Sequence, residues 1–416
     1  MSGVRTRMTC LALALGLTAA LAACGGGAPP GGPVTVLIPW APGTGEYAAF
    51  KAVIGPFERD TGIQVIPEST RALTQQLDAD LNVDDAPDIA DLPNPGTVNG
   101  YQHKGLVPTD VNLSSYEEPW RTLAESASGT VLAIPVKADI KGLLWYNTKT
   151  VTHPPANWAD LENLSKRGTP WCLGLASGPT SGWPGADWIA DLLLSTGQAD
   201  AYKNWLRGAL SWTSHQVRAA WQQWGTLIRD GAAVPGGAPE ALTTSFSGAI
   251  SGQCQLEHGA LAAIGLTSTS GYSYVRLPAA SDAPSPVMVS GDFMGLFTSN
   301  PNARRLLAYL ATTPAQRLWV SQPGGHAFSA DGAVPPASYP PGVQRQLAAL
   351  LRPGSGTALC FAAGDTMVPD MTAAFSQAVL DYVSDPASLP TLLRGLQKTE
   401  QGAGASPVWN RACATP

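Results

Sequence analysis

Apolar positions along the chain follow two spacings in turn, one typical of strands and one typical of helices. Residues 33–40, "PVTVLIPW", form a short β-branched apolar run of the kind that makes a buried strand. Residues 47–57 then carry apolar side chains at helical intervals, and Gly62 stands where a glycine commonly ends a helix. The series continues with a strand at 63–68, a helix at 74–87 and a strand ending in a turn at 88–96. This alternation predicts an α/β domain with a largely parallel sheet.

The second half of the chain adds longer helices. In residues 213–231, Trp221 and Trp224 share helical spacing with Val217 and Ile228, so we predict that both tryptophans lie in a core. The pattern also predicts two extended segments within 132–148 and a helix leading into a strand within 157–176. Later elements are a strand at 272–279, a strand or turn at 287–297, and helices within 300–322, 340–353 and 371–400.

The N-terminal segment has the pattern of an export signal. Arg5 and Arg7 precede an apolar run, residues 11–23, that is shorter than the roughly 20 residues a membrane-spanning helix needs. The run ends in "LAAC", which resembles the lipobox of bacterial lipoproteins. We therefore expect residues 1–23 to be a signal peptide and Cys24 to be acylated, with residues 24–33 as a flexible tether. An ordinary signal peptide with an incidental cysteine is the alternative.

Length and charge narrow the class of protein. Removal of residues 1–23 leaves 393 of the 416 residues, more than one core usually serves, so two domains are expected. The same removal takes away two arginines and no acids, which leaves 23 basic and 31 acidic residues and a formal charge of −8. This charge argues against nucleic acid as a partner.

Four cysteines remain in the exported chain, and an even number in an oxidising compartment favours two disulfides. Three pairings are possible, of which we favour Cys172 with Cys254 and Cys360 with Cys413. A metal site is the competing interpretation, but no Cys-x-x-Cys pair occurs and the five histidines are dispersed. We expect neither a metal nor a cofactor.

An ordered series of segments gives the chain a family resemblance. The segments are the strand ending at Trp40, "FERDTGIQV" (57–65), "DIADLPNPG" (88–96), "IPVKADIKGLLWYN" (134–147), "PWCLGLASGPTSGWPGADWIAD" (170–191), "GDFMG" (291–295) and "FAAGDTMVPDMTAAF" (361–375). No single segment is specific, but the ordered set behind a lipobox resembles the extracellular solute-binding proteins of ABC importers. Within family 1 of these proteins, the carbohydrate-binding group, it looks most like the α-glucoside-binding lipoproteins.

The resemblance implies the two-lobed type II periplasmic-binding-protein fold, with a hinge and a ligand cleft between the lobes. Lobe 1 is expected to contain residues 34–146 plus about 274–322, and lobe 2 about 147–273 plus about 323–416. Ligand binding would stabilise a hinge-closed state. The resemblance further implies a monomer that is lipid-anchored on the extracytoplasmic face of the cell membrane and delivers a saccharide to ABC permease subunits.

A saccharide site needs flat aromatic rings against the sugar faces and polar groups at the hydroxyls. Trp40 and Glu46 flank the first strand-to-helix turn, where open α/β sheets bind ligands. A first-turn carboxylate favoured by the helix dipole is the alternative for Glu46. The family segment that matches Lys137 and Asp139 lies beside the cleft, although an exposed strand edge has the same alternating pattern.

Four more candidates come from the matched segments. Trp145 falls near the expected hinge, with core packing as the alternative. Gly291 and Asp292 match a cleft-lining Gly-Asp segment, in which the glycine allows close approach of the backbone. Asp365 precedes a threonine and could equally cap a turn.

The main stacking surface is expected in the stretch that contains three tryptophans. Trp183 is predicted in the loop and Trp188 just inside the following helix, and five residues of spacing keep them off one helical face. We favour Trp183 as the stacking ring and assign Trp171 mostly to the core. Asp187 stands near the predicted helix N-terminus, where capping is its alternative role.

These expectations favour a binding protein over an enzyme. A secreted glycoside hydrolase would share the tryptophans and acids and needs two carboxylates across the scissile bond. The chain lacks the nucleophile-elbow, zinc-protease, P-loop and dinucleotide motifs. A lipoprotein scaffold that binds cell-wall polymer is a third class. The sequence leaves maltose-like, trehalose-like, amino-sugar and glycerophosphodiester ligands open.

Overall fold

A computed structural model describes residues 31–195, 199–229, 237–245, 254–261, 271–278, 285–352 and 354–414. The expected signal peptide and the candidate lipidation site Cys24 lie outside these residues. In the part of the chain that is described, no helix is long and apolar enough to cross a membrane.

The larger sheet has seven strands in the order β11-β10-β9-β3-β1-β2, with β4 paired to the other side of β9. Strand β1 pairs in parallel with β2 and β3, whereas β9 runs antiparallel to both β3 and β4. The bounds are β1 Val34–Ile38, β2 Val65–Ser69, β3 Ile89–Leu92, β4 Ala133–Ile140, β9 Val287–Leu296, β10 Leu359–Phe361 and β11 Cys413–Ala414.

Helices around this sheet complete a first hydrophobic core. They are α1 Gly45–Thr61, α2 Leu73–Asn82, α3 Pro95–Tyr101, α4 Trp120–Leu123, α10 Pro301–Leu310, α11 Thr313–Val320 and α12 Val343–Leu350. Local sequence sets the limits of α1, because the Thr44 side chain accepts a hydrogen bond from the Tyr47 N–H at its start. Gly62 ends the helix at φ 69°, a left-handed conformation that glycine adopts without strain, as predicted.

A second core surrounds a four-stranded sheet in the order β6-β7-β5-β8. Its strands are β5 Leu143–Asn147, β6 Trp171–Cys172, β7 Leu256–His258 and β8 Tyr272–Arg276. Its helices are α5 Trp158–Lys166, α6 Trp183–Ser195, α7 Ala199–Leu206, α8 His215–Arg229, α9 Gly237–Thr243, α13 Ala363–Thr366, α14 Pro369–Ser384 and α15 Leu389–Ala403. Trp221 and Trp224 are fully buried in this core, which confirms their predicted role.

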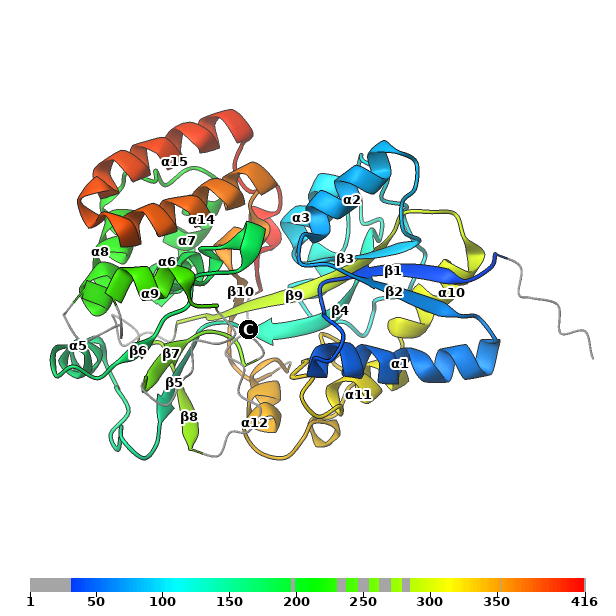
Figure 1. Cartoon of the computed structure of the whole chain (residues 1–416), viewed down its shortest axis with the longest axis horizontal. Helices are drawn as coiled ribbons and strands as arrows, with labels where there is room; N and C mark the ends of the chain where they lie inside the picture. The colour runs from blue at the N-terminus through cyan, green and yellow to red at the C-terminus, as the bar shows by residue number, and fades with distance from the viewer. Residues whose placement is uncertain are drawn as a thin grey trace, which may run out of the picture.

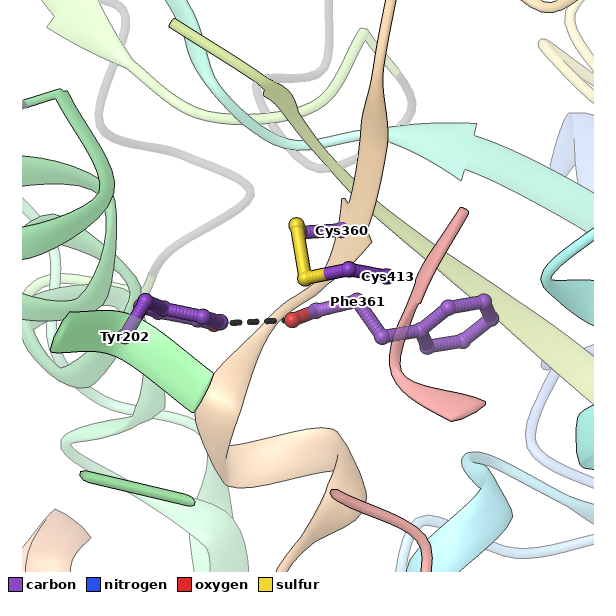
Figure 2. Close-up of a disulfide and its surroundings, with 4 residues drawn as sticks. All are labelled: Tyr202, Cys360, Phe361 and Cys413. Atoms are coloured by element: carbon purple, nitrogen blue, oxygen red, sulfur yellow. Dashed lines mark hydrogen bonds between the residues drawn. A yellow bond between two sulfur atoms is a disulfide. The ribbon is translucent and has the colours of Figure 1, made fainter. Parts of the chain in front are cut away.

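Both favoured disulfides are present. Cys172 is bonded to Cys254, which joins the end of β6 to the segment before β7, and Cys360 is bonded to Cys413 across β10 and β11. Beside the second bond, the buried Tyr202 hydroxyl of α7 donates a hydrogen bond of 2.7 Å to the Phe361 carbonyl (Figure 2). The short β10 strand is therefore held from both sides.

Within the described residues, the chain passes between the two cores in three places. It crosses from β4 to β5, along β9, and between α12 and β10; Figure 1 shows β9 running from one body of the molecule to the other. Residues 327–351 contribute Phe328, Tyr339 and Leu347 to the first core, and Phe328 forms a β-bridge with Ala138 of β4. The expected division assigned this stretch to the second lobe. We therefore propose that lobe 1 extends through α12.

Candidate functional site

Strand β4 places charged side chains at every second position along one face of the larger sheet. Lys137 lies opposite Asp292 of β9, and Asp139 lies opposite Ser290, so these side chains share a face. Lys141 follows two residues later, just beyond the end of β4, with its N–H bonded to the Met288 carbonyl. Lys137, Asp139 and Lys141 therefore form a row of charged side chains that runs from the first core toward the second.

Lys137 is held by carboxylates of the first lobe. Its side chain is 7% exposed, its ammonium contacts Glu46 near the start of α1, and Asp292 lies 4.0 Å away. Burial alone would lower the pKa of Lys137, but Glu46, Asp292 and Asp139 outweigh that effect and raise it. Lys137 is therefore a buried permanent cation. The β4 edge is not the exposed edge that the alternating pattern also allowed.

Lys141 is held by the second lobe. Its ammonium lies 3.2 Å from the Asp187 carboxylate of α6 and 3.1 Å from the Asp365 carboxylate of α13. It also lies 5.1 Å from the centre of the Trp183 ring, a cation–π distance. The two carboxylates overcome the effect of burial and raise the pKa of Lys141. Asp187 and Asp365 thus act as ion-pair partners in this structure, and neither is explained by capping alone.

The carboxylates outnumber the cations in this cluster. Burial raises the pKa of Asp139 to about 7, although Lys137 opposes the change. Burial likewise raises the pKa of Asp292 to about 6, with Lys137 opposing and Glu46 adding to the rise. Asp187 also has a pKa raised to about 6, again mainly by burial. These raised pKa values place the protonation of Asp139, Asp187 and Asp292 near neutral pH.

Trp40 and Trp145 lie in the packed interior, which corrects the expectation that they face a ligand. Trp40 is 4% exposed, and Phe50 and Trp319 each pack at 5.6 Å between ring centres. Trp145 is fully buried, and its indole N–H donates to the Gly259 carbonyl at 2.8 Å. Their ring faces are covered because the first strand-to-helix turn and β5 both point these side chains inward.

The two candidate tryptophans of α6 have different surroundings. Trp188 is 3% exposed, stacks on His258 at 4.2 Å, and meets Trp171 edge to face at 5.1 Å, so it is a core residue rather than a ligand platform. Trp183 is half-buried and is the first residue of α6, not part of the loop before it. It stands four residues from Asp187 and therefore shares a helical face with it.

Gly291 has a packing role that the sequence did not indicate. A Cβ atom at this position would lie 2.7 Å from the Lys137 carbonyl and 2.8 Å from the Trp120 indole nitrogen. That indole N–H donates to the Ser290 carbonyl at 2.9 Å. The close approach that requires glycine is thus between β9, β4 and Trp120.

Two groups at the site were missed as candidates. Lys141 was part of the "KADIK" alternation, which places it on the same face as Lys137 and Asp139, and this signal could have identified it. Asp91, within β3, is fully buried, and neither of its carboxylate oxygens has a hydrogen-bond partner among the described residues. An aspartate inside the apolar run "IADL" was the available signal.

Comparisons with known proteins find a matching family and similar individual proteins. The chain matches the family described as bacterial extracellular solute-binding protein over residues 52–340. It is similar to the osmoprotective compounds-binding protein GgtB of Synechocystis sp., with 28% identity over 366 residues that cover 81% of this chain and 86% of that protein. It is also similar to the alpha-glucosides-binding periplasmic protein AglE of Rhizobium meliloti, with 28% identity over 325 residues, 70% of each protein.

A solved structure shares the fold. The bacterial solute receptor AcbH, described as having an exclusive preference for β-D-galactopyranose, has a TM-score of 0.74 at 16% identity, over 89% of this chain and 99% of that one. Such neighbours confirm the expected two-lobed fold of type II periplasmic binding proteins.

The raised carboxyl pKa values predict that the ligand-free protein is more stable in mild acid than at neutral pH. Asp139, Asp187 and Asp292 have pKa values of about 6 to 7 in the fold against an ordinary 3.8, so the native state binds more protons between these values. Their stabilising protonation is complete below about pH 4 and is lost as the pH rises through about 6 to 7. We expect the melting temperature, measured by circular dichroism, to rise by about 5 °C or more from pH 8 to pH 5.

His326 opposes this rise in stability at low pH, and two variants test whether the carboxyls cause the rise. Burial lowers the pKa of His326, which reduces the gain below about pH 6.5. Asp139→Asn removes the carboxyl with the highest of the three pKa values and should flatten the slope, whereas Asp85→Asn, an exposed surface change, should leave it intact. A melting temperature that falls from pH 8 to pH 5, or an unchanged slope in Asp139→Asn, contradicts the assignment.

Proposed function

Because the chain belongs to the family of bacterial extracellular solute-binding proteins, we propose that it captures a carbohydrate for an ABC importer. The ligand we propose is an α-glucoside or a related di- or oligosaccharide, which the protein passes to the permease unchanged. The names of AglE, which refers to α-glucosides, and of GgtB, which refers to osmoprotective compounds, support a small polar ligand. Both proteins are similar to this chain over at least 70% of its length.

One observation carries the proposal: Lys141 follows β4 of the first core and is held by side chains of the second. Trp183, Asp187 and Asp365 come to this ammonium from α6 and α13, while Asp139 stands two residues away on the β4 side. A flat ring and hydrogen-bonding groups from both lobes thus lie together, which is the combination that a saccharide needs. We propose that the sugar binds here, in the interlobe cleft.

Ligand binding to both lobes would favour a closed arrangement, since bound sugar contacts each lobe only when they approach. In this structure the two lobes already contact each other near the site. A Cβ atom on Gly96 of α3 would lie only 2.2 Å from the Met367 carbonyl that follows α13, and Arg71 reaches Ser177 at 3.5 Å. The crossings near Lys141 and Gly142, along β9 and before β10 are the proposed hinge.

We propose no catalytic step at this site. The family and the similar proteins are binding receptors. Hydrolysis requires one carboxyl acid and one free carboxylate on opposite sides of the scissile bond. Here Glu46 engages Lys137, and both Asp187 and Asp365 engage Lys141, so these acids are already committed to ion pairs. Asp139 has no such partner among the described residues, so family membership, rather than the ion pairs, carries the proposal that the site holds a ligand without cleaving it.

The proposed location follows from the sequence alone. A signal peptide and an acylated Cys24 would place a monomeric receptor on the extracytoplasmic face of the membrane, beside the permease. The glycine- and proline-rich residues 25–33 would serve as its tether.

Purified mature protein is expected to bind at least one α-linked glucoside reversibly and to release it intact. Isothermal titration calorimetry with maltose and trehalose measures binding, and chromatography of the recovered sugar measures its integrity. Cleaved product would overturn the receptor proposal in favour of a hydrolase. Absence of binding heat with every saccharide would favour a scaffold lipoprotein.

Trp183→Ala is expected to weaken saccharide binding by about tenfold or more while the protein stays folded, because the half-buried ring supplies the stacking surface. Trp183→Phe, which keeps a flat ring, should retain most of the affinity. Trp224→Ala is the matched core control: its ring is fully buried, so the melting temperature should fall sharply. If Trp183→Ala lowers the melting temperature and leaves affinity unchanged, Trp183 is a core residue instead.

A further inference from the structure

The site contains more carboxyl groups than ammonium groups. Six carboxylates surround it, from Glu46, Asp91, Asp139, Asp187, Asp292 and Asp365, and two ammonium groups lie among them, from Lys137 and Lys141. Each lysine is already placed between carboxylates: Lys137 between Glu46 and Asp292, and Lys141 between Asp187 and Asp365. Asp91 and Asp139 have no salt bridge among the described residues.

Asp91 is a carboxyl group of this cluster that lies below the surface of the site. It lies opposite Met294 on β9, two residues from Asp292, and therefore on the same face of the sheet as Asp292 and Lys137. It is 0% exposed, and both carboxylate oxygens are without a hydrogen-bond partner in the described part of the chain. Burial disfavours an unpaired carboxylate unless a cation or a proton compensates it, and it raises the pKa of Asp91 well above the ordinary value.

Asp139, which lies closer to the lobe boundary, also lacks a hydrogen-bond partner for a buried carboxyl oxygen in the described part of the chain. Its Oδ1 atom is buried and has no hydrogen-bond partner among the described residues, although the residue as a whole is partly exposed. It lies on β4 between Lys137 and Lys141, and its register partner on β9 is Ser290, which offers no charge. Asp139 and the partly exposed Asp292 are therefore the carboxylates of lobe 1 best placed to meet a ligand directly.

A neutral sugar hydroxyl can donate a hydrogen bond to these carboxylates but cannot balance their charge. An ammonium group does both, and hydrogen bonds between two ionised groups are about twice as strong as neutral ones. A divalent metal is the other cation to consider. Within the described residues, however, no group of three or more His, Cys, Asp or Glu side chains is arranged to hold one.

We infer that the saccharide bound at this site carries a basic nitrogen, whose protonated form lies beside Asp139 and Asp292 with Asp91 beneath them. The inference rests on the proposed function and specifies its ligand as an amino-bearing glycoside. Asp139 and Asp292 accept hydrogen bonds from the ammonium group. Asp91 is fully buried and does not contact it. Burial raises the pKa of Asp91 well above its ordinary value, and a cation bound nearby lowers that pKa and so favours the ionised form.

Matched ligands test the inference directly on the mature protein. The probes are trehalose, trehalosamine, which has one primary amine in place of a hydroxyl, and N-acetyl-trehalosamine, in which the same nitrogen is neutral. A parallel series uses cellobiose, chitobiose (the disaccharide of glucosamine) and N,N′-diacetylchitobiose. Putrescine serves as a cation without a sugar. Calorimetry at pH 7 should give at least about tenfold tighter binding of the amine in one series than of its hydroxyl and N-acetyl counterparts.

Variants then connect the preference to the named carboxylates. Asp139→Asn keeps the shape of the side chain and should reduce the amine-to-hydroxyl affinity ratio by about fivefold or more, with little change in affinity for the neutral sugar. Asp91→Asn should reduce the same ratio, since an amide cannot ionise when a cation binds nearby. It should leave the melting temperature unchanged or higher, since it removes a buried carboxyl that has no hydrogen-bond partner among the described residues. Asp85→Asn is the surface control and should leave the ratio unchanged.

The outcomes separate this inference from the proposed function. Equal or tighter binding of the neutral sugars in both series overturns the inference and leaves the saccharide receptor standing. An amine preference that Asp139→Asn and Asp91→Asn do not reduce also overturns it, because the cation then lies elsewhere. Binding of putrescine without any saccharide overturns the proposed function and with it the amino-glycoside ligand.

Discussion

The salt bridges of Lys141 are the interaction on which the rest of the site depends. Its backbone continues β4 of the first lobe, but its ammonium is held by Asp187 and Asp365 of the second and lies over the Trp183 ring. A buried cation with two carboxylates fixes how these elements meet, because breaking one side leaves uncompensated charge. The polar groups of both lobes are thereby brought to one place, beside a chain crossing that can serve as a hinge.

The long antiparallel pairing of β4 with β9 explains why the remaining charges form a row. Direct register partners share a face, so Asp292 stands beside Lys137, and Asp91 joins them through the pairing of β3 with β9. Burial is the main reason that the pKa of Asp292 is raised, and Asp365 of the other lobe adds to the rise. A ligand that brings positive charge or hydrogen-bond donors therefore affects both lobes at once, which is how a binding event can be coupled to closure.

Much of the fold could be predicted, because it depends on local periodicity and on the even set of cysteines. The alternation of strands and helices, the αL glycine at Gly62, both disulfides and the buried Trp221 and Trp224 follow from such patterns. The site was harder to predict because side-chain depth depends on which elements pack together. Trp40, Trp145 and Trp188 are residues of the type that forms a sugar platform, but they are buried. Trp40 packs against Trp319, Trp188 stacks on His258, and the Trp145 indole N–H is bonded to the Gly259 carbonyl, all of which are far away in the sequence. Asp91 became significant only when sheet pairing placed it on the same face as Asp292.

The central claim is that one saccharide bridges the two lobes at the Lys141 cluster, and a crystal structure of the mature protein with its tightest-binding saccharide tests it most directly. The account predicts density for an intact sugar with one ring against Trp183 and with polar groups at Asp139 and Asp292, so that both lobes contact the same molecule. A sugar bound to one lobe only, or at a surface remote from Lys141, would contradict the account.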